Sequence, residues 1–208
     1  MAHKDKQVQV FLEELGSSSA TPGGGSAAAL AGAMGAGLVG MACRLTIGRK
    51  RFAGVEDELR GELNEAEALR LRLTDLANAD TQAFDQVMAA YRLPKQTRTE
   101  KATRQTSIQS ALQGATQVPL ETARACGAVV NLAAQVIDKI NPNALSDAAA
   151  AALLAEAGLK SAQLSVAVNL ADIDDLIFVE KTQEDLHTIL SGTDQVQARV
   201  FSYVMQHV

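Results

Sequence analysis

Two aspartates are candidates for acid–base chemistry, because each lies in a helical stretch with few other charges nearby. Asp80 stands in Asn78-Ala79-Asp80-Thr81, and Asp147 follows Leu145-Ser146 and precedes five alanines. Isolated carboxylates of this kind are suited to proton transfer. For Asp147 the alternative is a helix N-cap, a position that aspartate favours.

Histidine and cysteine chemistry is not indicated. The three histidines are scattered along the chain: His3, His187 and His207. They form neither metal-ligand spacing nor a Ser–His–Asp arrangement, so we expect no metal and assign proton transfer to carboxylates or lysine. The two cysteines, Cys43 and Cys126, form no Cys-x-x-Cys pair and are typical of buried, reduced thiols in a cytosolic protein.

A glycine-rich segment, Thr21-Pro22-Gly23-Gly24-Gly25-Ser26, comes directly before a long apolar stretch. Glycines at the start of a helix leave its first backbone N–H groups bare, so that an anion or a carbonyl group can dock there. A flexible connection capped by Ser26 explains the same residues. Both interpretations stay open at this point.

Basic residues gather at the other end of this stretch: Arg44, Arg49, Lys50 and Arg51. Helix C-termini favour such side chains, and a solvated helix end accounts for them. The alternative is recognition of carboxylates on a ligand. The chain has a formal net charge of −5 and no other basic block, which argues against nucleic acid as a partner.

Composition predicts an all-α protein. Hydrophobic residues make up 47% of the 208 residues but aromatic residues only 3%, so Ala, Leu and Val dominate, and these pack well between helices. Alternating strand patterns are almost absent. No linker divides the chain, and we predict a single domain over residues 1–208. The N-terminus lacks the apolar core of a signal peptide, so we expect a cytoplasmic protein.

The stretch from about 26 to 47 is almost free of charge and long enough to suggest a membrane span. We reject the span because much of it is Ala and Gly and because Arg44 lies near its end. Two stripes of residues recur at helical spacing. The apolar stripe consists of Ala27, Leu30, Met34, Leu38, Met41 and Leu45. The small stripe consists of Gly25, Ala29, Gly32, Ala36 and Gly40. Glycine costs about 1 kcal/mol in a helix relative to alanine, so the small stripe predicts close packing of another backbone against a buried central helix. The letters Gly-x-Gly-x-x-Gly at 35–40 match a dinucleotide fingerprint, but they lie inside this helix, and we expect no nucleotide site.

The spacing of apolar residues and the positions of helix-breaking Gly and Pro predict the other helices. A short helix holds Val8 to Leu15 and ends at Gly16, and a long one runs from about 55 to 91 with Leu59, Leu63, Ala66, Leu69, Leu73 and Leu76 inside. The next spans about 99–140, and Pro119 should kink or divide it. After a break at 141–143 we expect a helix over 147–170, and then a last helix or pair opened by Asp172, Asp174 and Asp175.

Several segments together resemble the cyclodeaminase/cyclohydrolase family of folate enzymes. They occur in the order of the family and cover about residues 8–170: the glycine-rich segment, Leu45-Thr46-Ile47-Gly48-Arg49-Lys50, Asp80-Thr81-Gln82-Ala83-Phe84, Leu93-Pro94-Lys95, Val118-Pro119-Leu120 and Asn143-Ala144-Leu145-Ser146-Asp147. The chain departs from the family at Ile140, where a glycine is common, and after Asp147, where Val-Gly-Ala is frequent.

The resemblance implies an all-helical homodimer with a folate site near the glycine-rich segment. The implied activity is hydrolysis of 5,10-methenyltetrahydrofolate to 10-formyltetrahydrofolate, because the chain looks more like the standalone cyclohydrolases. The alternative within the family is a cyclodeaminase that closes formiminotetrahydrofolate with loss of ammonia. Outside the enzymes, a folate-binding helical dimer without activity, or an interaction module, remains a hypothesis.

For the implied reaction we hypothesise roles for individual residues. Asp147 or Asp80 would activate water for attack on the cationic methenyl carbon, and Lys95 would assist proton transfer to the departing nitrogen. No cofactor beyond the tetrahydrofolate substrate is expected. The residues expected to bind the substrate are Pro22, Gly23, Gly24, Gly25, Ser26, Arg49, Lys50, Asn143 and Ser146.

Overall fold

The computed structural model describes residues 7–207, in which the elements are helices and no strand occurs. His3 and the rest of the N-terminal segment lie outside this range. The α-helices are α1 (Val8–Leu15), α2 (Gly24–Arg44), α3 (Glu56–Tyr91), α4 (Arg98–Val136), α5 (Leu145–Leu170), α6 (Leu176–Leu190) and α7 (Thr193–His207), with the 3-10 helices η2 (Lys50–Val55) and η3 (Pro142–Ala144). The prediction of an all-α protein built from long helices is confirmed.

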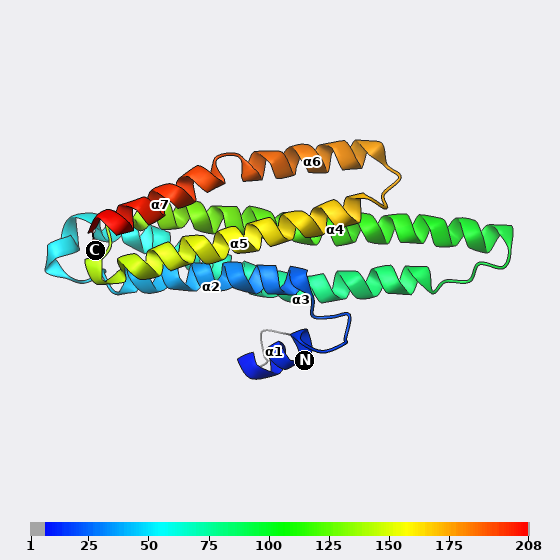
Figure 1. The fold of residues 1–208 in the computed structure, drawn as a ribbon, viewed down its shortest axis with the longest axis horizontal. Helices are drawn as coiled ribbons and strands as arrows, with labels where there is room; N and C mark the ends of the chain where they lie inside the picture. The colour runs from blue at the N-terminus through cyan, green and yellow to red at the C-terminus, as the bar shows by residue number, and fades with distance from the viewer. Residues whose placement is uncertain (1–6, 208) are drawn as a thin grey trace.

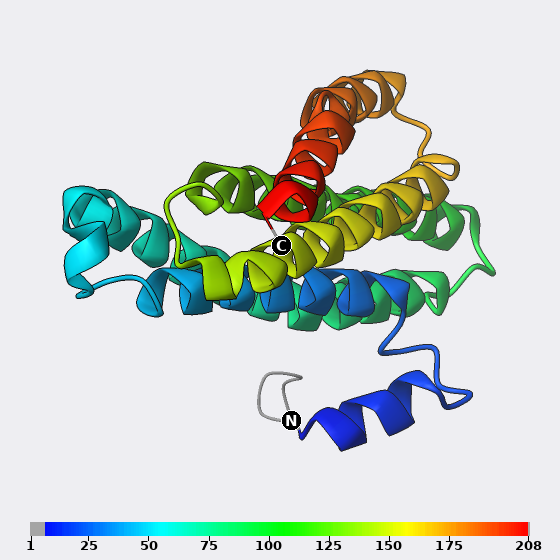
Figure 2. The same cartoon turned by 60° about the vertical axis from the view of Figure 1, so that its left-hand side comes forward.

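Four long helices, α2 to α5, lie side by side and enclose the core (Figure 1). Helices α6 and α7 run back over α4 and α5, whereas α1 stands away from the bundle on the side of the α2 N-terminus (Figures 1 and 2). The loop that carries Arg49 lies at one end of the bundle, and the loop between α3 and α4 lies at the other.

Helix α2 packs against α5 through small residues on both helices. A Cβ atom at Gly35 would lie 2.7 Å from the carbonyl oxygen of Ala151, and one at Gly158 would lie 2.6 Å from that of Ala28. These contacts show that the helices run antiparallel, and neither separation leaves room for a side chain. The predicted close approach of a second backbone to the small stripe is confirmed.

The central helix is buried on one side only. Its small stripe is enclosed, but Met34 is 56% exposed and Met41 and Leu45 are also exposed, so these three side chains of the apolar stripe face outward. Helix α2 is the one helix within residues 7–207 that is long and apolar enough to cross a membrane, with a mean hydropathy of 1.6. Of that apolar window, 61% is buried inside the protein, as in the core helix of a bundle.

Helix α4 continues through Pro119, so of the two expected effects, a kink or a division, the division does not occur. Proline removes the N–H that would bond the carbonyl four residues earlier, which here belongs to Ala115. The side-chain amide of Asn169 on α5 donates to that carbonyl at 3.0 Å. The carbonyl orphaned by Pro119 is therefore satisfied by the neighbouring helix, and α4 need not break.

The structure excludes the two interpretations of candidate site residues as helix N-caps. Helix α2 begins at Gly24 with Gly23 as its N-cap, so Ser26 lies inside the helix and does not cap it. Similarly, Asp147 lies within the first turn of α5 and is not its N-cap. By contrast, the carboxylate of Asp175 accepts from two backbone N–H groups at the start of α6, as expected of an acidic residue at a helix N-terminus.

Both cysteine side chains are fully buried. Desolvation raises the pKa of the Cys43 thiol to about 11 and that of Cys126 to about 12. Both groups are therefore protonated at neutral pH. This confirms the interpretation of the cysteines as buried, unpaired thiols.

Candidate active site

A cavity of about 550 Å³ lies where the N-terminal end of α2 meets α3, α4 and the C-terminal end of α5. Backbone and small side chains of the glycine-rich segment form one wall, and apolar side chains form most of the others. The lining residues that the argument uses are Gly23, Gly24, Gly25, Asp80, Phe84, Tyr91, Pro119, Leu164, Val168, Asn169 and Asp172.

Asp80 lies directly against the first turn of α2. The hydroxyl of Ser26 is 2.8 Å from Oδ2 of Asp80 and 3.0 Å from the carbonyl oxygen of Ala77, and Ser26 itself is completely buried. A Cβ atom at Gly25 would overlap Asp80, so glycine is required for the carboxylate to sit there. The carboxylate lies at the N-terminal, positive end of the α2 dipole. The glycine-rich segment and Asp80, far apart in sequence, thus form one site.

Ser26 is buried, donates to Asp80 and does not line the cavity, which is the geometry of a residue that positions the carboxylate. The structure thus places it behind the carboxylate, whereas a substrate contact was expected. Its single proton can go to the Asp80 carboxylate or, when Asp80 is protonated, to the carbonyl of Ala77. The hydroxyl can therefore support Asp80 in both protonation states.

Replacing Ser26 with alanine should lower turnover by about tenfold, since one hydrogen bond to a charged group contributes about 1.5–3 kcal/mol and water can replace part of it. The replacement fits the space that Ser26 occupies. Steady-state kinetics across pH provide the measurement, and the pH at half-maximal rate should move with the S26A change. Threonine at this position, which keeps the hydroxyl, is the matched control. A fall in thermal stability with an unchanged pH profile would reduce Ser26 to a packing role.

The aromatic wall of the cavity comes from the face of α3 that carries Asp80. Phe84 and Tyr91 follow Asp80 by four and eleven residues, which is helical spacing, and they are 37% and 41% exposed. On α5, Leu164 and Val168 are 68% and 69% exposed at the same cavity. Apolar side chains left open around a few polar groups are typical of sites for flat organic ligands. Sequence reasoning missed these four residues, although the helical spacing from Asp80 would have indicated the two on α3.

Two residues expected at the site do not line the cavity. Pro22 is buried, although its neighbours Thr21 and Gly23 contribute to the wall. Lys95 is exposed in the loop between α3 and α4, beyond the last cavity residue of α3, which is Tyr91. Within one chain, the structure therefore brings neither side chain into the cavity wall.

The remaining expected residues gather at the opposite end of α2: Arg49, Lys50, Asn143, Ser146 and Asp147. The backbone N–H of Asn141 donates to the hydroxyl of Thr46 at 2.8 Å, which fastens the start of η3 and α5 to the end of α2. Because α2 has 21 residues, its two ends are separated by about 30 Å at a rise of about 1.5 Å per residue. The two candidate carboxylates, Asp80 and Asp147, thus lie in two separate groups within one chain.

Within residues 7–207, no group of three or more His, Cys, Asp or Glu side chains is placed to hold a metal ion. The ionisable side chains that line the cavity are Asp80, Asp172 and Tyr91. The site can therefore offer two carboxylates to a ligand within an otherwise largely apolar wall.

The sequence model of the formiminotransferase-cyclodeaminase family matches residues 7–188. The chain belongs to this family. A methenyltetrahydrofolate cyclohydrolase of Methylorubrum extorquens is 46% identical over 204 residues, which cover 98% of this chain and 98% of that protein. The formimidoyltransferase-cyclodeaminase of Rattus norvegicus is 34% identical over 186 residues, but these cover 89% of this chain and only 34% of the rat protein.

A solved structure from the same family has the same fold. The crystal structure of a formiminotetrahydrofolate cyclodeaminase from Thermotoga maritima matches with a TM-score of 0.88 and 28% sequence identity, and the match covers 98% of each chain. The family resemblance inferred from the sequence motifs is confirmed, and the family match includes both ends of α2.

Proposed function

We propose that this chain is a methenyltetrahydrofolate cyclohydrolase, an enzyme of folate metabolism that hydrolyses 5,10-methenyltetrahydrofolate to 10-formyltetrahydrofolate. The cavity supports this function, because Ser26 and Gly25 hold Asp80 in an apolar pocket of suitable size for a folate ring. The near full-length similarity to a methenyltetrahydrofolate cyclohydrolase supports the same reaction.

The reaction needs a base and a site for a cation. Asp80 takes a proton from water as the water oxygen bonds to the methenyl carbon, which neutralises the charge of the ring. The bond between this carbon and N5 then breaks, N5 keeps the electron pair and receives the proton from Asp80, and the second proton of the former water leaves to solvent. The product is the N10-formyl compound, with one proton released. The substrate is already electrophilic, so the reaction requires no metal or further cofactor.

The roles of the other expected residues follow from their positions. Gly23 and Gly24 bring backbone against the ring, and Phe84 and Tyr91 provide the aromatic wall. Lys95 lies outside the cavity, and in this scheme Asp80 itself returns the proton that Lys95 was expected to supply. We place the enzyme in the cytoplasm, where its two thiols would stay reduced.

We further propose that the enzyme acts as a homodimer paired along α2. The exposed row of Met34, Met41 and Leu45 is an apolar surface on the side of α2 that faces away from the bundle, and Met34 lies at the midpoint of the helix. A two-fold axis that passes near Met34 and is perpendicular to α2 makes the two copies of α2 antiparallel. Each cavity would then face the end of the partner's α2, where Arg49 and Asp147 lie, so that the two groups of expected residues form one site and basic side chains meet the folate glutamate tail.

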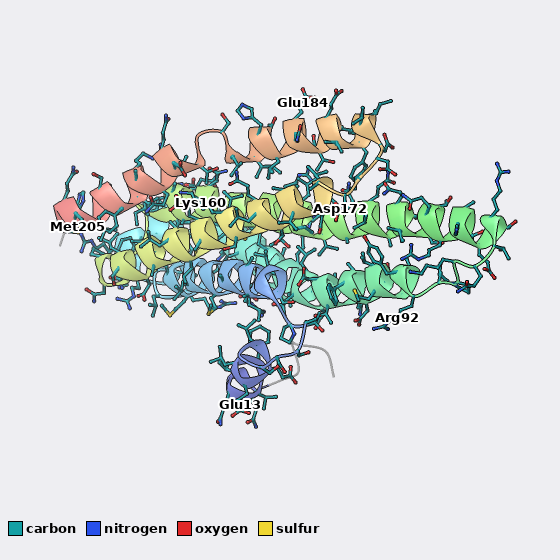
Figure 3. All side chains as sticks on the ribbon, turned by 45° about the vertical axis from the view of Figure 1, so that its right-hand side comes forward. Glu13, Arg92, Lys160, Asp172, Glu184 and Met205 are labelled. Atoms are coloured by element: carbon teal, nitrogen blue, oxygen red, sulfur yellow. The ribbon has the colours of Figure 1, made fainter. Side chains whose placement is uncertain are left out.

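Replacing Met34 with glutamate places a charge at the centre of the proposed interface and should yield monomers with little activity. Sedimentation velocity measures the association, and the hydrolysis assay measures activity. Met205→Glu is the matched control, because Met205 is also exposed but lies on α7 (Figure 3), which packs against α4 and α5. A wild-type protein that sediments as a fully active monomer would contradict the pairing.

The hydrolysis itself is tested by adding the purified protein to methenyltetrahydrofolate and following the loss of its absorbance against the uncatalysed rate. Accelerated loss with formation of 10-formyltetrahydrofolate supports the proposal. The second candidate is formiminotetrahydrofolate cyclodeaminase, which the fold match to the Thermotoga maritima enzyme favours. Release of ammonia from formiminotetrahydrofolate identifies that activity, whereas folate binding without either reaction identifies a non-catalytic protein.

A further inference from the structure

The cavity contains a second carboxylate that neither the motifs nor the scheme above uses. Asp172 lies in the short linker between α5 and α6 and lines the same cavity as Asp80 (Figure 3). Among the lining residues there is no lysine, arginine or histidine. A ligand in the cavity of one chain therefore meets two negative charges and no positive side chain.

Side chains of α4 hold the linker in place. The amide of Gln109 donates to the carbonyl oxygen of Asp172 at 2.9 Å, and its oxygen accepts from the backbone N–H of Asp174 at 2.8 Å. Gln105 and Gln113 lie one turn before and one turn after Gln109 on α4. The side-chain amide of Gln105 donates to the carboxylate of Asp174, and the side-chain amide of Gln113 donates to the carboxylate of Asp175. Three glutamines at four-residue spacing thus clamp the linker to one face of α4.

A further contact fixes the end of α5 that leads into this linker. As described above, Asn169 bonds the carbonyl of Ala115 that Pro119 leaves without a helical partner. Both Asn169 and Pro119 also line the cavity. The position of Asp172 therefore depends on an anchor at the preceding turn and a clamp on its own backbone.

The linker aspartates are used differently. The carboxylates of Asp174 and Asp175 accept hydrogen bonds from α4 or from the start of α6. Within residues 7–207, by contrast, the carboxylate of Asp172 has no hydrogen-bond or ion-pair partner. The fold thus holds the Asp172 backbone firmly and leaves its charge available to the cavity.

We propose that Asp172 is a specificity residue that favours the cationic methenyl form of the folate over uncharged folate rings. The inference rests on the proposed function, which supplies the positive charge of the substrate. Ring hydrolysis removes that charge, so the attraction to Asp172 is lost in the product. The same carboxylate therefore favours both capture of the substrate and release of 10-formyltetrahydrofolate.

The test compares ligands that carry the same glutamate tail and differ in ring charge. For Asp172→Asn, kcat/KM for methenyltetrahydrofolate should fall by about three- to tenfold, the scale of one partly solvated charge pair. The inhibition constant of tetrahydrofolate, whose ring is uncharged, should stay within about twofold, because no charge pair is lost. Higher salt should reduce the difference in kcat/KM for methenyltetrahydrofolate between the wild type and the variant, because salt screens the charge pair.

Asp174→Asn is the matched control, because Asp174 lies in the same linker but does not line the cavity. In this variant, the preference for methenyltetrahydrofolate, measured by kcat/KM, over tetrahydrofolate, measured by its inhibition constant, should equal that of the wild type. Equal weakening of both ligands in Asp172→Asn would overturn the proposal, since it indicates a structural role, and so would an unchanged ratio in an active variant. If the wild type fails to hydrolyse methenyltetrahydrofolate, the proposed function fails, and the inference fails with it.

Discussion

Asp80→Asn should lower kcat for methenyltetrahydrofolate hydrolysis by about 10²- to 10⁴-fold, the usual contribution of a positioned acid–base group. Asparagine matches aspartate in shape and still accepts the hydrogen bond from Ser26, so the cavity should stay intact. Its amide cannot take a proton from water. Initial rates at saturating substrate provide the measurement, and KM should change much less than kcat.

The matched control is Asp85→Asn, which removes an exposed carboxylate from the same helix but outside the cavity. Its rate should equal that of the wild type. Equal melting temperatures for the wild type, Asp80→Asn and Asp85→Asn would exclude unfolding as the cause of a lost rate. An Asp80→Asn protein with wild-type kcat would remove Asp80 from the mechanism.

The same assay on Asp147→Asn separates the two candidate carboxylates. The sequence interpretation allowed either residue as the base and expected this variant to lose turnover. Within one chain, Asp147 lies at the opposite end of α2 from the cavity. Loss of activity in Asp147→Asn with an intact fold would therefore require a contribution across the proposed dimer. Full activity would exclude Asp147 as the base and leave Asp80.

Gly158→Ala should lower the free energy of unfolding by about 1–3 kcal/mol, the usual cost of overpacking a core. The added Cβ would lie 2.6 Å from the carbonyl oxygen of Ala28 and 3.0 Å from the sulfur of Cys126. The first neighbour is backbone, so α2 and α5 must move apart to admit the methyl group. Urea unfolding followed by circular dichroism measures the change.

Gly114→Ala is the control for the effect of glycine on helix propensity. Gly114 is exposed in α4, and a Cβ there meets nothing within 4 Å. Alanine should therefore stabilise the protein by up to about 1 kcal/mol. Opposite signs for the two substitutions would support the close packing, whereas stabilisation by Gly158→Ala would show that α2 and α5 are not in tight contact.

The order and type of the helices could be predicted because local signals agree with the packing. Leu59 and Leu73 recur on one face of α3 and are completely buried, and the short helix predicted to end at Gly16 does so. The burial of α2 could be predicted less well, because both of its stripes are apolar. Close contact with α5 decides which stripe is inside, and this depends on Gly158, a residue far along the chain.

The site could be predicted where a motif itself supplies the geometry. The glycine-rich segment and Asp80 were singled out separately, and they meet because glycine at position 25 leaves space for the carboxylate. The continuity of α4 through Pro119 could not be predicted, since its compensating partner is Asn169 on another helix. Asp172 was missed for the same reason, because contacts with α4 bring it to the cavity.

The most direct test is a crystal structure of the Asp80→Asn variant soaked with methenyltetrahydrofolate, which the slowed enzyme should retain. We expect the pterin ring in the cavity between Gly24 and Phe84, with the methenyl carbon one water molecule away from residue 80. Folate bound only at the Arg49 and Asp147 end of the bundle, in a chain whose cavity is empty, would contradict this mechanism.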